Sequence, residues 1–201
     1  MRLIKTAVMV SGGGTNLQAI IDAKEKGIIK NADICLVLSN KEDAYALQRA
    51  KNHNIKTTVV LKNDNKETFE DRLISVLEEN GIELIVLAGF MSILSEKFTN
   101  RFKDRIINVH PSLIPSFCGE GFYGLKVHEA ALSYGVKVTG ATVHFVNEIP
   151  DGGKIIMQQA VSVKEGDTPE ILQKRVMEEA EWNILPRAVE EVSLKILQGE
   201  L

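Results

Sequence analysis

Residues 7–23, AVMVSGGGTNLQAIIDA, decide the fold of this chain, because two hydrophobic periods meet within them. Ala7–Val10 is a short apolar run with β-branched residues, which is typical of a buried strand. Ser11–Gly14 supplies the backbone freedom of a tight turn. From Asn16 onward apolar residues recur at helical spacing, and Gly27 is suited to end the helix. The stretch therefore predicts a buried strand that turns directly into a helix.

The same alternation continues through the first half of the chain. Further strands are predicted over residues 34–38, 57–61, 84–88 and 105–109. Helices are predicted over residues 44–52 and 66–79. Strands and helices that alternate at this spacing form a parallel sheet with helices on both faces.

The second half follows a different pattern. Residues 111–124 are rich in proline and glycine and predict a long loop, a kind of segment that is often functional. After a predicted helix over 125–134, strands over 136–145 and 154–163 are joined by a connection that resembles a long hairpin. An antiparallel addition to the sheet is therefore expected.

The C-terminal region predicts helices. Thr168-Pro169 is a helix start, with threonine at the cap and proline in the first turn. This helix is expected to reach about Trp182, with a break before Pro186 and a last helix ending at Gly199. The predicted fold is α/β: a Rossmann-like, doubly wound, mostly parallel sheet with an antiparallel C-terminal strand addition and C-terminal helices.

Composition limits the class of protein. The chain has 201 residues, 44% hydrophobic and 25% charged, with a net charge of −3 and a pI near 5.9. We expect a soluble cytoplasmic protein, most naturally an enzyme, because no apolar run approaches the roughly 20 residues that span a bilayer. Mild acidity without a Lys/Arg cluster argues against a nucleic-acid partner. Cys35 and Cys118 have neither a metal-binding spacing nor a disulfide framework, and no metal site is predicted.

Ser11–Asn16 is the first candidate site. Backbone N–H groups at a helix N-terminus carry partial positive charge, so this loop could hold a phosphate. A P-loop would need a lysine at its end, and a dinucleotide-binding loop would need a third glycine where Leu17 stands and an acid near Ser39-Asn40. We interpret the loop as a site for a phosphate monoester rather than a nicotinamide cofactor. A tight turn without a ligand is the alternative.

Asn108 and His110 form the second candidate site. Residues two apart on a strand face the same way, and these two lie at the carboxyl end of a predicted strand, where open α/β sheets bind ligands. Pro111 biases His110 toward an extended backbone. An amide that donates hydrogen bonds beside an imidazole suits attack on a carbonyl group. A purely structural histidine is the alternative.

Asp151, which precedes two glycines, is the third candidate. Asp-Gly is a frequent turn signal, so a turn alone could explain it. If its carboxylate reached His110, it would orient the imidazole and raise its pKa. The sequence spacing does not show that it does. His128 and His144 are expected to be structural or peripheral, because no histidine pair has metal-ligand spacing.

Four motifs occur in order along the chain: SGGGTNLQA at 11–19, LAGFM at 87–91, NVHPSLIP at 108–115 and DGG at 151–153. Together they resemble the phosphoribosylglycinamide formyltransferases, folate-dependent enzymes of purine synthesis, over nearly the whole chain. The resemblance implies formyl transfer from 10-formyltetrahydrofolate, a co-substrate, to the amine of glycinamide ribonucleotide, without a metal. It further implies one formyltransferase domain, residues 1–201, with a phosphate-binding half at 1–105 and a folate and catalytic half at 106–201. A cytoplasmic monomer or weak homodimer is expected.

The resemblance also implies a set of site residues. Asn108 and protonated His110 would donate hydrogen bonds to the oxyanion, and Asp151 would keep His110 charged. The residues expected to bind the substrate are Gly13, Gly14, Thr15, Asn16, Glu178 and Glu181. Those expected to bind the folate are Lys66, Met91, Ser92, Ile93, Leu94, Asn108, Asn147, Glu148, Ile149, Pro150 and Asp151. The Ile114–Pro115 bond is expected to be cis.

Several positions depart from the family pattern. Ser92 stands where many members have arginine, and Lys66 replaces an arginine on the folate side, which keeps the charge but loses the bidentate fork. The stretch Cys118–Gly124 is several residues longer than in better-known bacterial members. Lys126 stands where some relatives carry histidine.

Three other functions fit the sequence less well. Methionyl-tRNA formyltransferase would need a C-terminal RNA-binding domain, and formyltetrahydrofolate hydrolase an N-terminal regulatory domain, so the length of the chain disfavours both. A phosphate-sensing binding module would bind ligands without turnover. The presence of Asn108, His110 and Asp151 disfavours that interpretation.

Overall fold

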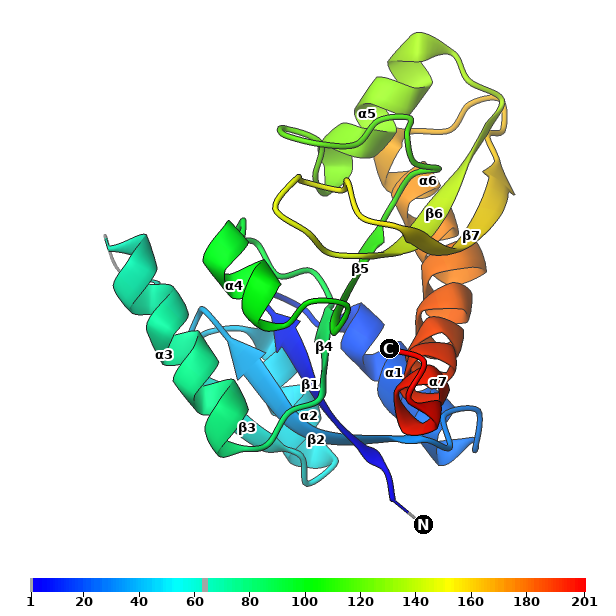
Figure 1. Ribbon diagram of the computed structural model, residues 1–201. Coiled ribbons are helices and arrows are strands. Elements are labelled where there is room, and N and C mark those ends of the chain that lie inside the picture. Colours follow the sequence, from blue (N-terminus) through cyan, green and yellow to red (C-terminus); the bar gives the residue numbers. More distant parts are fainter. Residues whose placement is uncertain (1, 63–64) are drawn as a thin grey trace.

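The computed structural model describes residues 2–62 and 65–201, and of Lys66 only the backbone. A seven-stranded sheet in the order β3-β2-β1-β4-β5-β6-β7 runs through the molecule (Figure 1). The strands are β1 (Ile4–Val10), β2 (Ala32–Ser39), β3 (Lys56–Val59), β4 (Leu84–Leu87), β5 (Ile106–His110), β6 (Val138–Phe145) and β7 (Ile155–Ser162). The first five pair in parallel, whereas β6 pairs with β5, and β7 with β6, in antiparallel fashion. This topology confirms the predicted fold class.

Helices cover both faces of the sheet. They are α1 (Thr15–Glu25), α2 (Tyr45–Asn52), α3 (Lys66–Glu79), α4 (Glu96–Arg101), α5 (Leu125–Tyr134), α6 (Pro169–Val176), the π-helical turn η1 (Met177–Glu181) and α7 (Trp182–Gln198). Figure 1 shows α1 beside α7 on one side of the sheet and α3 and α4 on the other. Residues of α1, α2 and α7 share one buried apolar cluster, and residues of α3 and α4 share a second. The doubly wound arrangement therefore has a core on each face.

Two helical features differ from the sequence prediction. The short helix α4 was not predicted; the Ser95 side chain accepts a hydrogen bond from the Phe98 N–H, and Phe98 is fully buried. The predicted break before Pro186 is wrong, because α7 continues through this proline. Pro186 and its neighbours Ile184 and Leu185 are buried, so packing holds the helix against the core despite the missing N–H donor.

The sheet order creates a binding crevice at a defined place. From β1 the chain adds β2 and β3 on one side, and then β4 and β5 on the other, so the strand order reverses between β1 and β4. Ligands of open α/β sheets bind outside the carboxyl ends of the strands at such a point. The segments that follow β1, β4 and β5 all meet at this edge. Among the described helices, none has the length and apolar character needed to cross a membrane.

Candidate active site

A cavity of about 930 Å³ opens at the carboxyl ends of β4 and β5. Asn108, His110 and Asp151 line it together, although Asp151 lies far along the chain on the connection between β6 and β7. Of the other predicted site residues, 91–94, 147–150, Asn16 and Glu181 also line the cavity, whereas Gly13, Gly14, Thr15 and Glu178 do not. The structure therefore brings Asp151 to Asn108 and His110, which the sequence spacing could not show.

The His110 imidazole is held at both nitrogen atoms. Its side chain is 5% exposed, and its Nδ1 lies 3.4 Å from Oδ2 of Asp151. Its Nε2 donates a hydrogen bond to the backbone carbonyl of Phe117 at 2.9 Å. Since a carbonyl can only accept, Nε2 carries a proton. A second proton would enter at Nδ1, next to Asp151.

Asp151 occupies a turn, as its Asp-Gly sequence predicts, yet its side chain points into the site. Its backbone φ is 56°, in the left-handed region. Oδ2 accepts a hydrogen bond from the N–H of Gly119 at 2.9 Å, and Oδ1 lies 3.6 Å from Nε2 of His144. Burial raises the pKa of Asp151, but the His144 contact, the nearby His110 and the Gly119 N–H outweigh it and lower the pKa. The carboxylate is therefore ionised at neutral pH.

The pKa of His110 differs from the sequence expectation. Burial lowers it and the adjacent charge of Asp151 raises it, with the bond to Phe117 also raising it and His144 lowering it. The net direction is downward from 6.5. Asp151 thus raises the pKa of His110, as expected, but the effect of burial is larger in the ligand-free protein. In either protonation state the ring donates through its Nε2–H to the Phe117 carbonyl.

His144 belongs to the site and is not peripheral. It lies opposite Asn108 in the antiparallel pairing of β5 with β6, and its side chain is 2% exposed. Its Nδ1 donates to the carbonyl of Phe145 at 2.8 Å, so its Nε2 can accept from Nδ2 of Asn108 at 3.2 Å. This bond orients the Asn108 amide. Sequence reasoning missed His144 because finding it requires the register between the two strands.

The glycine loop, Ser11–Gly14, contacts α2 as well as α1. Gly14 has a φ of 72°, and a Cβ at this position would lie 2.5 Å from the Cβ of Ala46. Packing against α2 thus demands glycine at position 14, whereas a Cβ at Gly13 would meet open space. At the start of α1, the Thr15 hydroxyl contacts Sδ of Met177 at 3.3 Å, and Nδ2 of Asn16 donates to Oε2 of Glu181 at 2.7 Å.

Both predicted substrate glutamates, Glu178 and Glu181, belong to the π-helical turn η1, but their side chains have different surroundings. Glu181 is 8% exposed and lines the cavity; burial raises its pKa, opposed by the bond from Asn16. Glu178 lies on the surface, where its Oε1 is 3.8 Å from Nζ of Lys174. The turn therefore presents Glu181, and not Glu178, to the cavity. π-Helical turns are rare and occur frequently at functional sites.

The predicted folate residues form the other wall of the cavity. Met91, Ile93 and Ile149 are large apolar side chains that remain more than half exposed, as a cavity wall requires. The Met91 N–H donates to the Ser11 hydroxyl at 2.8 Å, and the Ser92 hydroxyl accepts from Nδ2 of Asn40 at 3.1 Å. The remaining predicted members of this wall are Leu94, Asn147, Glu148 and Pro150, all of which line the cavity. The predicted role of the Lys66 side chain lies outside the described residues.

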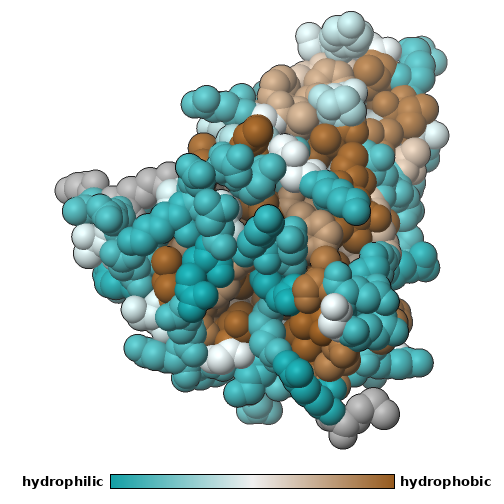
Figure 2. All heavy atoms as spheres, viewed as in Figure 1, coloured by the Kyte–Doolittle hydropathy of each residue, from teal (hydrophilic) through white to brown (hydrophobic). Residues whose placement is uncertain are grey.

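The loop Cys118–Gly124 borders the same cavity. Gly119–Gly124 lines it, and Lys126 donates from Nζ to the Tyr123 hydroxyl at 3.0 Å while lying over the Tyr123 ring. The expected cis bond at Ile114–Pro115 is present. Figure 2 shows more hydrophobic surface on the upper part of this face, around α5 and the neighbouring strands, than around α3.

Another buried histidine borders the cavity. His128 of α5 is fully buried, and neither ring nitrogen has a hydrogen-bond partner among the described residues. Burial and the nearby His110 lower its pKa to about 4. It is therefore neutral at physiological pH. Within the described part of the chain, no group of three or more His, Cys, Asp or Glu side chains forms a metal-binding cluster.

Comparisons with known proteins agree with this geometry. The formyl transferase family model matches residues 4–189. The chain is 43% identical to the phosphoribosylglycinamide formyltransferase of Haemophilus influenzae, covering 92% of this chain and 85% of that protein. It is 44% identical to the trifunctional purine biosynthetic protein adenosine-3 of Gallus gallus, covering 97% of this chain but only 19% of that protein's length.

A solved structure gives the same result in three dimensions. The crystal structure of glycinamide ribonucleotide transformylase 1 from Symbiobacterium toebii superposes with a TM-score of 0.89 at 39% identity, covering 96% of this chain and 88% of that one. The order of the strands, the cavity at their carboxyl ends and these matches lead to one assignment. The chain belongs to the formyl transferase family, among its phosphoribosylglycinamide formyltransferases.

Proposed function

We propose that this chain transfers the formyl group of 10-formyltetrahydrofolate to the amine of 5-phosphoribosylglycinamide in purine biosynthesis. The products are formylglycinamide ribonucleotide and tetrahydrofolate. The observation that carries the proposal is the convergence of Asn108, His110 and Asp151 in one cavity with a glycine loop nearby. Family membership supplies the reaction class.

In this proposal the ribonucleotide lies between the glycine loop and η1. Its phosphate would accept hydrogen bonds from the backbone around Gly13–Asn16 at the N-terminus of α1, where the helix dipole favours an anion. Asn16 donates to Glu181, and the Glu181 carboxylate would accept from the ribose hydroxyls. Glu178 is not included, because it pairs with Lys174 on the surface.

The folate would lie along the opposite wall. A flat heterocycle can pack against the exposed apolar side chains of Met91, Ile93 and Ile149, while backbone groups of residues 91–94 and 147–151 satisfy its polar edge. Both segments approach the catalytic residues. Each proposed subsite therefore combines residues from both halves of the chain. The ribonucleotide subsite takes Gly13–Asn16 from before residue 106 and Glu181 from after it. The folate subsite takes residues 91–94 from before it and residues 147–151 from after it.

The reaction forms one bond and breaks another at the formyl carbon. The amine attacks the carbonyl and gives a tetrahedral intermediate with a negative oxygen; the bond to folate N10 then breaks, and a proton from the amine passes to N10. Asn108, oriented by His144, and the Nε2–H of His110 would donate to the oxygen, a contribution that typically amounts to 10²–10³ in rate per donor. In the ligand-free protein the Phe117 carbonyl accepts the Nε2–H of His110. The developing oxyanion must therefore replace that carbonyl.

The proposal is tested by following an isotopic label. Formyl folate with ¹³C in the formyl group is incubated with the protein and glycinamide ribonucleotide, and the products are analysed by mass spectrometry. We expect the label in the ribonucleotide. Label in free formate would show a hydrolase, and label that stays on the folate would show a binding module.

A further inference from the structure

The glycine loop is fixed from the side of α2 as well as by its own helix. The N–H of Ala46 donates to the Gly12 carbonyl at 3.0 Å, and Nε of Arg49 donates to the Gly13 carbonyl at 2.8 Å. Two successive carbonyl groups of the loop therefore point toward α2. Neither contact was expected from the sequence.

This orientation determines where the following N–H groups point. In a trans peptide the C=O and the next N–H point in opposite directions, and both of these peptide bonds are trans. The N–H groups of Gly13 and Gly14 consequently face away from α2. Among the described residues neither donates to a protein acceptor. They are free to donate to a ligand anion.

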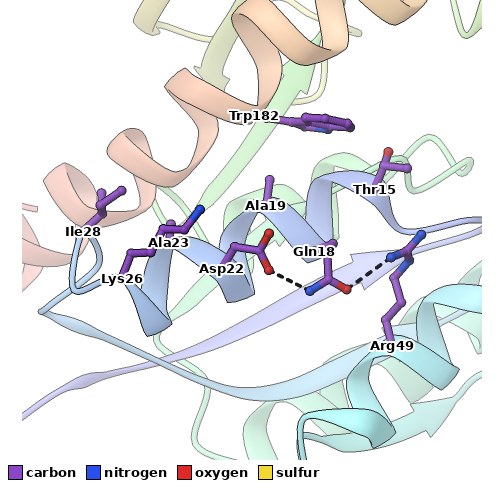
Figure 3. A pocket seen from close by; sticks show the side chains of 9 residues that line it. All are labelled: Thr15, Gln18, Ala19, Asp22, Ala23, Lys26, Ile28, Arg49 and Trp182. Atoms are coloured by element: carbon purple, nitrogen blue, oxygen red, sulfur yellow. Dashed lines mark hydrogen bonds between the residues drawn. The ribbon is translucent and has the colours of Figure 1, made fainter.

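Arg49 is itself held in a fixed geometry. Its Nη1 donates to Oε1 of Gln18 at 3.2 Å, and its guanidinium lies 5.1 Å from the centre of the Tyr45 ring. Figure 3 shows the side chain reaching from α2 to the first turn of α1, toward Gln18 and below Thr15. The planar guanidinium therefore bridges three elements: α1, α2 and the glycine loop. Its positive charge also lies near the N-terminus of α1, which is favourable for an anion bound there.

We infer that Arg49 is a positioning residue for the phosphate of the substrate. It acts through the Gly13 carbonyl, which it holds so that the Gly14 N–H faces the phosphate, and it does not itself contact the reacting atoms. The inference rests on the proposed function, which places the phosphate at this loop. A lysine would keep the charge and could reach the carbonyl, but it lacks the fork that also engages Gln18.

Steady-state kinetics and phosphate binding test the inference. Arg49→Met is expected to raise KM for the ribonucleotide by about tenfold or more, because it removes a charged hydrogen bond that orients the loop. Both kcat and the KM for formyl folate should stay close to their wild-type values. The Kd for inorganic phosphate, measured by calorimetry, should rise in parallel. Arg49→Lys should fall between wild type and Arg49→Met.

Arg105→Met is the matched control. Arg105 is also half-buried and also donates to a main-chain oxygen, that of Leu201 in the terminal carboxylate at 2.7 Å, but it precedes β5 at the opposite end of the strand from the cavity. Its substitution should leave both KM values unchanged. Circular dichroism and thermal unfolding of every variant show whether it folds, and if Arg49→Met does not fold, Arg49→Lys carries the comparison.

Two results would overturn the inference: an unchanged KM for the ribonucleotide in the folded Arg49 variants, or an equal rise in KM for both substrates. The phosphate measurement separates this inference from the proposed function. If wild type binds phosphate but transfers no formyl group, the proposed function is wrong, and the effect of Arg49 on phosphate binding still decides the inference. If wild type binds no phosphate, the inference is wrong whatever the activity.

Discussion

Asp151 contacts three groups at once: His110, His144 and the N–H of Gly119. Its charge raises the pKa of His110 against the effect of burial. In Asp151→Asn the pKa of His110 should therefore fall further. Because a protonated imidazole is the stronger donor to the oxyanion, the limb of the pH profile that falls with rising pH should move to lower pH, and the rate at neutral pH should drop.

The measurement is kcat/KM for the ribonucleotide as a function of pH. The asparagine keeps the size of the side chain and can still accept from Gly119, so a shift of the limb reports the lost charge. A variant with reduced activity but an unshifted limb would show that Asp151 acts through position alone.

His128 gives a second prediction at the residue scale, this time about stability. Its pKa is about 4 in the folded protein and close to 6.5 when unfolded. Below pH 6.5 the unfolded chain binds a proton that the folded chain does not, so stability should fall as the pH decreases from 6.5 to 4. The linkage amounts to about 3 kcal/mol over this range.

His128→Met removes the titrating group and fills a similar volume. The free energy of unfolding, measured by urea denaturation between pH 7 and pH 4, should fall less steeply in the variant than in wild type. Parallel curves for the two proteins would show that His128 does not titrate abnormally.

At the scale of elements, the junction between the glycine loop and α2 makes a sharp prediction. Gly14→Ala places a Cβ 2.5 Å from the Cβ of Ala46 and imposes a positive φ on alanine. The expected cost is on the order of 1–3 kcal/mol in the free energy of unfolding. Gly12→Ala is the matched control, since a Cβ there meets nothing within 4 Å and its φ is not positive.

Thermal or urea unfolding of the two variants decides this point. Gly14→Ala should be clearly less stable than wild type, whereas Gly12→Ala should be close to it. Similar stabilities for both variants would mean that the loop relaxes away from α2, and the packing explanation for Gly14 would fail.

The secondary-structure elements differ in how well the sequence predicts them. The strand-to-helix transition at residues 7–23 was predictable because a local change of hydrophobic period encodes it. The π-helical turn η1 was not, because residues 177–181 differ little in helix propensity from their neighbours. Its position is set by packing: Ala180 and Glu181 are buried, and Asn16 of α1 bonds to Glu181.

At the scale of the whole molecule, the fold could be predicted and the assembly of the site only in part. Alternating strands and helices imply the parallel sheet and the edge at which ligands bind. The meeting of His110 with Asp151, and of Asn108 with His144, depends on how β6 and its following connection return to β5. Asp151 could be singled out by its Asp-Gly turn and its role by the resemblance to a family, whereas the contacts of His144 and Arg49 depend on the three-dimensional packing.

The central claim is that the cavity catalyses formyl transfer that depends on the ribonucleotide. The most direct test is the absorbance change as 10-formyl-5,8-dideazafolate loses its formyl group, measured over a series of glycinamide ribonucleotide concentrations. We predict no change without the ribonucleotide and a rate that rises to saturation with it. Loss of the formyl group at the same rate with and without the ribonucleotide would contradict the claim, as would no loss at any concentration from the folded protein.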